Sequence, residues 1–327
     1  MSFKDIKGNL KVIEALKVSF SKGKEANSYL FWGQAGIGKK LVAITIAKVV
    51  NCLERKYDFD CCDVCRNCIR IEKFIHPDVF CIFPEESGSI KIDQIRYIKE
   101  RVYLKSYEAK KKFFIIDDAE TLTIEAANAF LKILEEPSGD SLFILVSSKP
   151  NLLPSTVLSR CQKISFSPLA KDILEEFLRK EFRLERNLSH YLAYFCEGRL
   201  GKALRLIKEN NDILGMKNKI IDEFVFSDGF YEDKDIKRNL LKENLNILIS
   251  WFRDLYFIKI GFPYSELINI DRKDDLLKMM KFYSLEEVKD IIDFISDSIS
   301  YLEKNVNPKL IISGIKTKLW RRYSMSV

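Results

Sequence analysis

The chain has 327 residues, of which 47% are hydrophobic and 31% are charged. This length suggests two or three domains, and the composition excludes a small disulfide-stapled protein, a fibrous protein and a disordered chain. The formal net charge of +7 permits contact with nucleic acid but does not demonstrate it, and an ordinary solvated surface of mixed charge is the favoured interpretation.

Neither a membrane span nor a secretory leader is visible in the sequence. The longest apolar runs, near residues 142–146 and 255–262, fall short of the roughly 20 residues that cross a bilayer. The first residues, MSFKDIKGNL, contain no apolar leader segment. We therefore expect a cytoplasmic protein without a membrane partner.

Strands and helices alternate in the first half of the chain. Strands are predicted from short β-rich runs at residues 29–32, 79–83, 113–116, 142–146 and 164–166. Helical patterns lie between them, for example at residues 41–50, 92–99 and 126–134. Such alternation predicts a parallel α/β sheet. We place the end of this domain at residue 168, because six of the 8 prolines and seven of the 13 glycines come before residue 169.

A phosphate-binding loop is predicted directly after the first strand, where residues 33–40 read GQAGIGKK. The glycines at Gly33, Gly36 and Gly38 would let backbone N–H groups face a phosphate at the start of the next helix. Lys39 would reach the β- and γ-phosphates, as in a P-loop. The alternative is a glycine turn that arose by chance.

The residues at two positions of this predicted nucleotide site indicate that it does not hydrolyse ATP. A P-loop continues with Ser or Thr, whose hydroxyl ligates Mg²⁺, whereas this chain has Lys40. The strand at residues 113–116 leads into Asp117 and Asp118, as in a Walker B strand. Asp117 is the natural metal-side carboxylate, but Asp118 is one methylene shorter than the Glu that usually activates water. We expect that ATP or ADP can be held without being hydrolysed.

Five of the eight cysteines lie within residues 52–68, at positions 52, 61, 62, 65 and 68. In a reducing compartment this crowding favours a metal over disulfides. Four thiolates at such spacings can enclose one tetrahedral Zn²⁺ and leave no open position for water, so the site would be structural. An iron–sulfur cluster and unliganded thiols are the alternatives. His76 is a further conceivable ligand, although His-Pro-Asp before a strand more often caps that strand.

Beyond residue 168 the pattern is helical. One buried face is marked by Leu245, Leu248, Ile249, Phe252, Leu255 and Tyr256. Ser284 and Glu287 predict a capping box, and Asn307-Pro308 predicts the start of a last helix. The charged stretch 231–242 is interpreted as a loop or an exposed helix face. The fold class is therefore α/β followed by all-α.

Several separate segments resemble the clamp-loader subunits of bacterial DNA polymerase III. They are YLF at 29–31, GQAGIGKK at 33–40, HPDV at 76–79, IKIDQIR at 90–96, AANAFLKILEEP at 126–137 and LLPSTVLSRCQ at 152–162. The resemblance spans most of residues 1–170 and implies an AAA+ domain at 1–168 with a zinc module at 52–68. It further implies a small helical lid at 169–208 and a helical collar at 209–327 that oligomerises.

The resemblance also bears on the zinc ligands. The family's zinc module has the spacing C-x₈-C-x₂-C-x₂-C, whereas nine residues separate Cys52 from Cys62 here. Choosing Cys61 would restore the first spacing but spoil the second, and the compact run fixes local geometry more tightly than the longer loop. Cys61 would then be a spare thiol. We therefore predict the zinc ligands Cys52, Cys62, Cys65 and Cys68.

Arg160 stands in the tripeptide Ser159-Arg160-Cys161. The resemblance implies that this arginine is a finger that enters the ATP site of a neighbouring subunit. A cation placed at the transferred phosphoryl group is worth about 10³ to 10⁵ in rate. Arg160 is thus the predicted catalytic residue, acting in trans; the alternative is a surface arginine that closes a helix.

Three departures from the family's motor subunits, called γ or τ, favour its stator subunit, called δ′. They are Lys40, Asp118 and Gly201, the last of which falls where a lid sensor arginine would be. A stator would help load the sliding clamp onto primed DNA, together with γ/τ and δ subunits, within the DNA polymerase III holoenzyme.

Two competing hypotheses remain. One is an ATP-hydrolysing motor of the γ/τ type that has tolerated Lys40. The other is a DNA-binding zinc protein that uses the cysteines and the basic segment 105–112, although Tyr107 and Glu108 within it favour a solvated turn.

Overall fold

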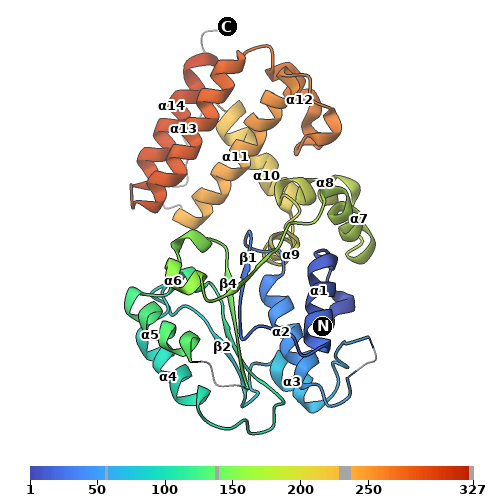
Figure 1. The fold of residues 1–327 in the computed structure, drawn as a ribbon. Helices are drawn as coiled ribbons and strands as arrows, with labels where there is room; N and C mark the ends of the chain where they lie inside the picture. Colours follow the sequence, from blue (N-terminus) through green and yellow to red (C-terminus); the bar gives the residue numbers. More distant parts are fainter. Residues whose placement is uncertain (56–57, 137–139, 228–236, 324–327) are drawn as a thin grey trace. The chain divides into compact units, whose positions relative to one another are not determined.

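The structure is a computed structural model that describes residues 1–55, 58–136, 140–227 and 237–323. The chain forms two compact units (Figure 1). The first contains residues 1–170 and 198–202, and the second contains residues 171–197 and 203–327. No helix in the described part of the chain is both long and apolar enough to cross a membrane.

The first unit is built on a five-stranded sheet in the order β2-β3-β4-β1-β5. Its strands are β1 (Ser28–Trp32), β2 (Val79–Ile82), β3 (Lys112–Ile116), β4 (Ser141–Ser147) and β5 (Gln162–Ser165). Every neighbouring pair is parallel, which confirms the predicted parallel α/β sheet. Four strands begin or end within a residue of their predicted bounds. The last begins two residues earlier than predicted, because Gln162 already pairs with Tyr29.

Helices cover both faces of this sheet (Figure 1). One face carries α1 (Leu10–Ser21), α2 (Lys39–Asn51) and α3 (Arg66–Glu72), and the other carries α4 (Ile92–Val102), α5 (Ile124–Glu135) and α6 (Ser155–Leu158). Alternate residues of β3 enter the two cores: Phe113 and Ile115 face the α2 side, whereas Phe114 and Ile116 face the α4 side. A strand buried on both faces needs a continuous apolar run, which is what the sequence provides.

The second unit is helical. Its helices are α7 (Lys171–Glu181), α8 (Arg186–Phe195), most of α9 (Leu200–Glu209), α10 (Ile213–Ile221), α11 (Arg238–Lys259), α12 (Lys273–Met279), α13 (Leu285–Glu303) and α14 (Pro308–Tyr323). Helices α10 to α14 share one apolar core centred on Trp251 and Phe252.

The predicted helix signals in this unit are confirmed. Leu245, Leu248, Phe252 and Leu255 are fully buried, while Ile249 and Tyr256 pack partly against the same core. In the capping box, the Ser284 N–H donates to Glu287 over 2.7 Å and the Glu287 N–H donates to the Ser284 hydroxyl over 3.2 Å. Helix α14 begins at Pro308 as expected. Of the stretch 231–242, residues 231–236 lie outside the described residues, and α11 begins at Arg238.

Polar contacts join α7 and α8 to the later helices of the second unit. The His190 ring lies 2.9 Å from the Glu175 carboxylate through Nδ1 and 2.8 Å from the Leu267 carbonyl through Nε2. Lys217, whose side chain is buried, donates to both carboxylate oxygens of Asp271. Residues 171–197 therefore belong to the same compact unit as the C-terminal helices, and the lid and collar bounds stay predictions.

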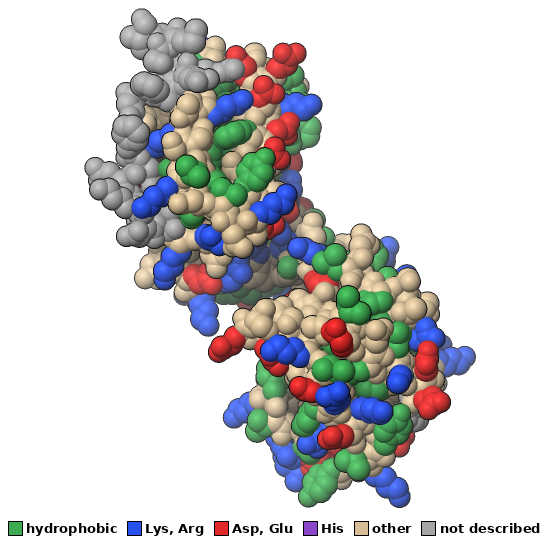
Figure 2. Space-filling model, turned by 90° about the vertical axis from the view of Figure 1, so that its left-hand side faces the viewer, with side chains coloured by type: hydrophobic (Ala, Val, Ile, Leu, Met, Phe, Trp, Pro, Cys, Tyr) green, Lys and Arg blue, Asp and Glu red, His purple; other side chains and the backbone are tan. Residues whose placement is uncertain are grey.

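Charged side chains of both signs are interspersed on the face of the molecule in Figure 2. In the basic segment 105–112, Tyr107 is 84% exposed, in line with a solvated turn. Lys112 is instead buried at the start of β3, and its ammonium donates to the carbonyls of Arg101 and Leu104. Lys111 pairs with Glu25. The two lysines nearest β3 therefore stabilise the fold and are not free to contact a phosphate backbone.

Asp78 fixes this segment from the start of β2. Its carboxylate accepts hydrogen bonds from the backbone N–H groups of Tyr107, Glu108 and Ala109, at 2.8 to 3.0 Å. Burial alone would raise the pKa of Asp78, but these three donors lower it below the usual value. Asp78 in turn donates its own N–H to His76 Nδ1 over 3.1 Å, so the His-Pro-Asp motif organises the strand entry as expected.

We predict that Asp78→Asn lowers the free energy of unfolding by about 1–3 kcal/mol at neutral pH, since an amide replaces one acceptor oxygen with a donor. Because the folded pKa is depressed, the carboxylate's contribution is present at neutral pH and is lost as the pH falls below about 4. The difference between the two proteins in urea unfolding should therefore narrow in acid. Glu86→Gln, which neutralises an exposed loop acid, is the control. A difference that stays constant down to pH 3 would contradict this account.

Candidate functional site

The phosphate loop lies between β1 and α2, at the carboxyl edge of the parallel sheet, where ligands of such sheets bind. Gly33 has φ +144°, and a Cβ on it would lie 2.4 Å from the Phe166 carbonyl oxygen. Gly36 has φ +82°, a left-handed conformation that side chains rarely adopt. These two positions explain why the loop needs glycine. Helix α2 begins at Lys39, so its first N–H groups are directed at the loop.

Lys39 is folded onto its own loop. Its ammonium donates to the carbonyl oxygens of Gly33 at 2.6 Å and Gln34 at 2.7 Å. Burial lowers the pKa of Lys39, while the nearby carboxylates of Glu120, Asp117 and Asp118 oppose that shift. The side chain therefore lies at the loop, as a P-loop lysine should.

Lys40, the second residue of α2, forms an ion pair with Asp117, which directly follows β3. Its Nζ is 3.0 Å from Asp117 Oδ2. The same ammonium lies over the ring of Phe83, 4.1 Å from the centroid, and 5.9 Å from the centroid of Phe74. A lysine side chain thus contacts the carboxylate that a metal ion would need.

A second contact involves the segment 198–202, which belongs to the first unit. The Gly201 N–H donates to the Gly36 carbonyl over 2.7 Å. A Cβ on Gly201 would lie 2.8 Å from that oxygen and 3.1 Å from the Gly36 Cα. Because both neighbours are backbone atoms, a side chain at position 201 requires the loop or the segment to move. The position where the family resemblance implies a sensor arginine is therefore filled by direct backbone packing.

Two acidic groups follow β3 beyond Asp117. Asp118 adopts a left-handed conformation with φ +47°, and its pKa is raised by partial burial and by repulsion from Asp117 and Glu120. Glu120 accepts from Ser148, at 3.0 Å from the N–H and 2.6 Å from the hydroxyl. These hydrogen bonds outweigh burial and lower the pKa of Glu120. Sequence reasoning missed Glu120, although an acid beside the Walker B pair and the Ser147-Ser148 pair at the end of β4 were available signals.

The cysteine group lies beside the C-terminal end of α2. Cys52 directly follows that helix, Cys65 precedes the first residue of α3, and Cys68 lies in the first turn of α3. The sulfur atoms of Cys52, Cys62, Cys65 and Cys68 all lie within 4.8 Å of one another. The Cys62 N–H donates to the Cys52 sulfur, and the Cys65 N–H donates to the Cys62 sulfur, at 3.4 and 3.3 Å.

This arrangement fits a tetrahedral Zn²⁺. Zinc–sulfur bonds of about 2.3 Å place the four sulfurs about 3.8 Å apart, and the Cys52 sulfur lies 3.5 Å from that of Cys62 and 3.9 Å from that of Cys65. Burial raises the pKa of Cys52 to about 12. Burial also acts to raise the pKa of Cys65, but hydrogen bonds to its sulfur lower it to about 6. Metal binding would therefore displace protons, and its affinity would rise with pH.

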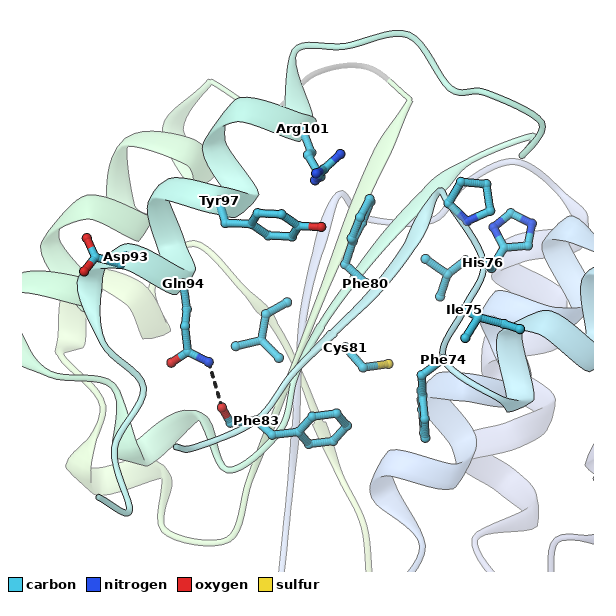
Figure 3. Close-up of a pocket in the computed structure, with 13 residues that line it drawn as sticks. Phe74, Ile75, His76, Phe80, Cys81, Phe83, Asp93, Gln94, Tyr97 and Arg101 are labelled. Atoms are coloured by element: carbon cyan, nitrogen blue, oxygen red, sulfur yellow. Dashed lines mark hydrogen bonds between the residues drawn. The ribbon is translucent and has the colours of Figure 1, made fainter. Parts of the chain in front are cut away.

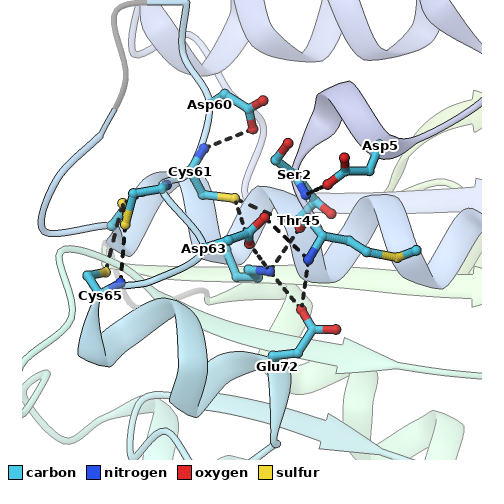
Figure 4. A network of polar contacts seen from close by, with 12 residues as sticks. Ser2, Asp5, Thr45, Asp60, Cys61, Asp63, Cys65 and Glu72 are labelled. Carbon is cyan, nitrogen blue, oxygen red and sulfur yellow. Dashed lines mark hydrogen bonds and ion pairs between the residues drawn. The ribbon is translucent and has the colours of Figure 1, made fainter.

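Cys61 lies beside this group with its thiol directed at Asp63 (Figure 4), and a hydrogen bond with Cys61 raises the pKa of Cys68. The Cys61 thiol donates to Asp63 Oδ1 over 3.4 Å, and its side chain is fully buried. Lys48 of α2, also buried, pairs with Asp63 and with Glu72 of α3. This network ties the phosphate-loop helix to the cysteine segment. The structure thus groups the four cysteines chosen from the sequence, and the fifth contacts Cys68 of that group while donating to Asp63.

Arg160 lies just before β5, close to the C-terminal end of α5. Its guanidinium donates to Glu135 over 2.6 Å and to the Thr156 carbonyl over 3.0 Å, and its side chain is 36% exposed. Because β5 runs parallel to β1 and Arg160 precedes it, this arginine lies toward the amino edge of the sheet. The phosphate loop follows β1 at the carboxyl edge. The structure therefore does not bring Arg160 to the phosphate loop of its own chain.

Comparisons with known proteins place this geometry in a family. A family model described as DNA polymerase III, delta subunit, matches residues 8–170. The DNA polymerase III subunit delta′ of Bacillus subtilis is 28% identical over 322 residues, which cover 94% of each chain. The chain belongs to the clamp-loader subunits of DNA polymerase III.

Motor-type clamp-loader subunits are similar as well. The subunit gamma/tau of Mycoplasma genitalium is 29% identical over 306 residues, which cover 86% of this chain and 50% of that relative. Among solved structures, a gamma subunit-related protein from Thermotoga maritima superimposes with a TM-score of 0.50 at 16% identity, over 95% of this chain and 99% of that one. This likeness concerns the fold alone. Membership among clamp-loader subunits is thus shown, while the choice between subunit types depends on the site.

We predict that the purified clamp-loader subunit contains about one zinc per chain, and that Cys62→Ser removes most of it. Cys61→Ser is the matched control, because that thiol is adjacent in sequence but lies in the Asp63 network. Metal content by mass spectrometry and thermal unfolding with a chelator are the measurements. Equal zinc loss in both variants, or loss only in Cys61→Ser, would show that the ligand set is wrong.

Proposed function

We propose that this chain is the δ′-type stator of the DNA polymerase III clamp loader. It helps to load the sliding clamp onto primed DNA in a ring with γ/τ and δ subunits. Its own nucleotide site does not hydrolyse ATP, and Arg160 acts in the ATP site of a neighbouring subunit. Residues 169–208 serve as its lid and residues 209–327 as the collar through which it assembles. The ion pair between Lys40 and Asp117 is the observation on which this proposal rests most.

The Lys40 ion pair removes two parts of an ATPase site at once. The hydroxyl that would ligate Mg²⁺ is missing, and the carboxylate that would hold the metal is neutralised by an ammonium at 3.0 Å. A divalent cation at Asp117 would face that positive charge at close range. Without the metal, the β- and γ-phosphate oxygens lose their main electrostatic partner. Nucleotide could still rest on the loop amides and Lys39, but without catalytic turnover.

The Gly201 contact supports the same conclusion from another direction. A motor subunit of this family is expected to extend an arginine from this position toward the γ-phosphate. Here the position lacks a side chain, and its backbone lies against Gly36. Arg199 and Lys202 are neighbouring cations, but they stand in a different register of the segment. A substitution that added a long side chain at Gly201 would first have to separate the segment from the loop.

The position of Arg160 supports action in trans. The side chain is partly exposed, near the amino edge of the sheet and away from its own phosphate loop. Its partner Glu135 is 50% exposed, and exposed ion pairs of this kind contribute little stability. The guanidinium can therefore leave Glu135 at small cost when a neighbouring subunit offers a phosphate.

Zinc, if bound, would have a structural role. The thiolates of Cys52, Cys62, Cys65 and Cys68 would hold it, and the metal would fix the C-terminal end of α2 to the start of α3. The Lys48 ion pairs connect the same two helices. The metal would thus help to position the phosphate-loop helix without touching a nucleotide.

A γ/τ-type motor is the second candidate, and the similarity to the Mycoplasma genitalium subunit gamma/tau favours it. A motor of this kind would need Lys40 to leave Asp117 when Mg²⁺ and ATP bind. Steady ATP turnover by the purified chain, abolished by Lys39→Ala, would establish that alternative.

We predict that the purified chain hydrolyses no ATP, and that Arg160→Ala lowers the ATPase of a loader assembled with motor subunits and primed DNA. The ATP site of the neighbouring subunit that faces Arg160 should lose about 10³-fold or more in rate. The total ATP turnover of the loader should therefore fall by the fraction that this one site contributes. Arg205→Ala, which removes an exposed arginine of α9, is the control. Unchanged loader activity with Arg160→Ala, in a complex shown to be intact, would exclude this role.

We predict that Lys40→Thr introduces a Mg²⁺ dependence into nucleotide binding. The change removes the ammonium from Asp117 and supplies a hydroxyl ligand, so ATP affinity in Mg²⁺ should exceed that in EDTA by about tenfold, or about 1.4 kcal/mol. The unmodified chain and the exposed-site control Lys22→Thr should bind equally with and without Mg²⁺. Calorimetry gives both affinities. A strong Mg²⁺ dependence in the unmodified chain would contradict the assigned role of Lys40.

A further inference from the structure

A groove runs along β2 (Figure 3), and its residues Phe74 and Phe83 lie beside the Lys40 ammonium at the end of the phosphate loop. Its cavity has a volume of about 750 Å³. Helix α4 forms one wall with Tyr97 and Arg101, and the segment after α3 forms the other with Phe74 and Ile75. The floor consists of β2 itself and the residue after it, Phe83.

The floor of the groove is an unpaired sheet edge. Strand β2 is the outermost strand on its side of the sheet, and among the described residues it pairs with β3 alone. Only every second residue of β2 directs its backbone groups at β3. Thus the N–H groups of Phe113 and Asp117 donate to the carbonyls of Asp78 and Ile82. The N–H and C=O groups of Cys81 therefore point the other way, into the groove. At the two ends of this edge, the Val79 N–H donates to the His76 carbonyl and the Phe83 carbonyl accepts from Gln94, so the open backbone groups centre on Cys81. Open groups on an edge strand are a template for another strand.

The walls of the groove are apolar and exposed. Phe74 is 45% exposed, Ile75 62% and Tyr97 44%. Phe74 ends α3 in a left-handed conformation with φ +57°, a position usually taken by glycine. There its ring contacts Phe83 edge-on, with the ring centroids 5.8 Å apart. A strained, exposed aromatic residue beside an open strand edge is more typical of a binding surface than of a solvated turn.

Two charged side chains, Asp93 and Arg101, line this channel, and Asp93 is paired with Arg96 over 2.9 Å. The Arg101 guanidinium stacks on Tyr97, 4.3 Å from the ring centroid, and lies 5.6 Å from that of Phe80. Its Nε is buried and has no hydrogen-bond partner among the residues that the structure describes. A buried donor without a partner is costly, and a carboxylate is the acceptor that best matches a guanidinium.

We propose that this groove binds an extended segment of another protein, which adds to the sheet as a strand beside β2. The backbone of the segment pairs with Cys81, and its apolar side chains lie against Phe74 and Tyr97. An Asp or Glu in the segment meets Arg101. Strand addition of this kind obtains affinity from main-chain hydrogen bonds and specificity from the pockets beside them. The proposal does not depend on which type of clamp-loader subunit the chain is.

The test begins with ten-residue random peptides displayed on phage and selected against the full-length chain. Selected peptides should alternate apolar residues and contain an Asp or Glu. In fluorescence anisotropy, Cys81→Pro should weaken them at least about tenfold, because it removes the outward N–H while leaving the β3 ladder intact. Cys81→Ala, which keeps that N–H, should bind as the unmodified chain does. Arg101→Gln should weaken acidic peptides but not their Glu→Gln counterparts.

Two further measurements keep the test independent of variant folding. Binding should protect the Cys81 amide from hydrogen exchange, and N-methylation of alternate backbone amides in the peptide should abolish binding. Failure to select any peptide, or binders that are indifferent to both N-methylation and Arg101→Gln, would overturn the proposal. Sedimentation equilibrium tests whether the edge pairs with a second copy of this chain instead. A dimer that persists with Arg101→Gln and with added peptide, but dissociates with Cys81→Pro, would show such pairing and would overturn the proposal as well.

Discussion

In the proposed account, the contact between the Lys40 ammonium and the Asp117 carboxylate, 3.0 Å apart, determines what this clamp-loader subunit does with a nucleotide. The fold supplies everything else that a phosphate site needs: a glycine loop after β1, a helix N-terminus and Lys39 beside the loop. One side chain then places positive charge at the carboxylate that would hold Mg²⁺. Because metal charge is central to phosphoryl transfer, we propose that this one residue leaves the architecture of an ATPase without ATP hydrolysis.

The other features of the first unit are arranged around that loop. Gly201 lies against it on one side. At its far end, α2 continues into the cysteine group and is fixed to α3 by the buried ammonium of Lys48. Phe83, under the Lys40 ammonium, also borders the β2 groove. A partner strand in that groove would therefore lie close to the proposed nucleotide site, because Phe83 borders both the groove and Lys40.

Much of this could be predicted from the sequence because local patterns determined it. The apolar run of β3 requires burial on both faces, the Ser284 capping box fixes the start of α13, and the cysteine spacing selected the four sulfurs that the structure brings together. Contacts that depend on the tertiary fold could not be predicted. The sequence indicated that Lys40 lacks a hydroxyl, but not that it pairs with Asp117. Nor could it show that Gly201 packs on Gly36 or that Glu120 binds Ser148, because the members of each pair are distant along the chain.

The most direct test of the account is a crystal structure of the purified chain grown with Mg²⁺ and a non-hydrolysable ATP analogue. The account predicts that Lys40 stays paired with Asp117, and that any nucleotide on the loop is bound without a metal ion. A Mg²⁺ ion ligated through Asp117, with Lys40 displaced toward solvent, would contradict it and would make this chain a motor.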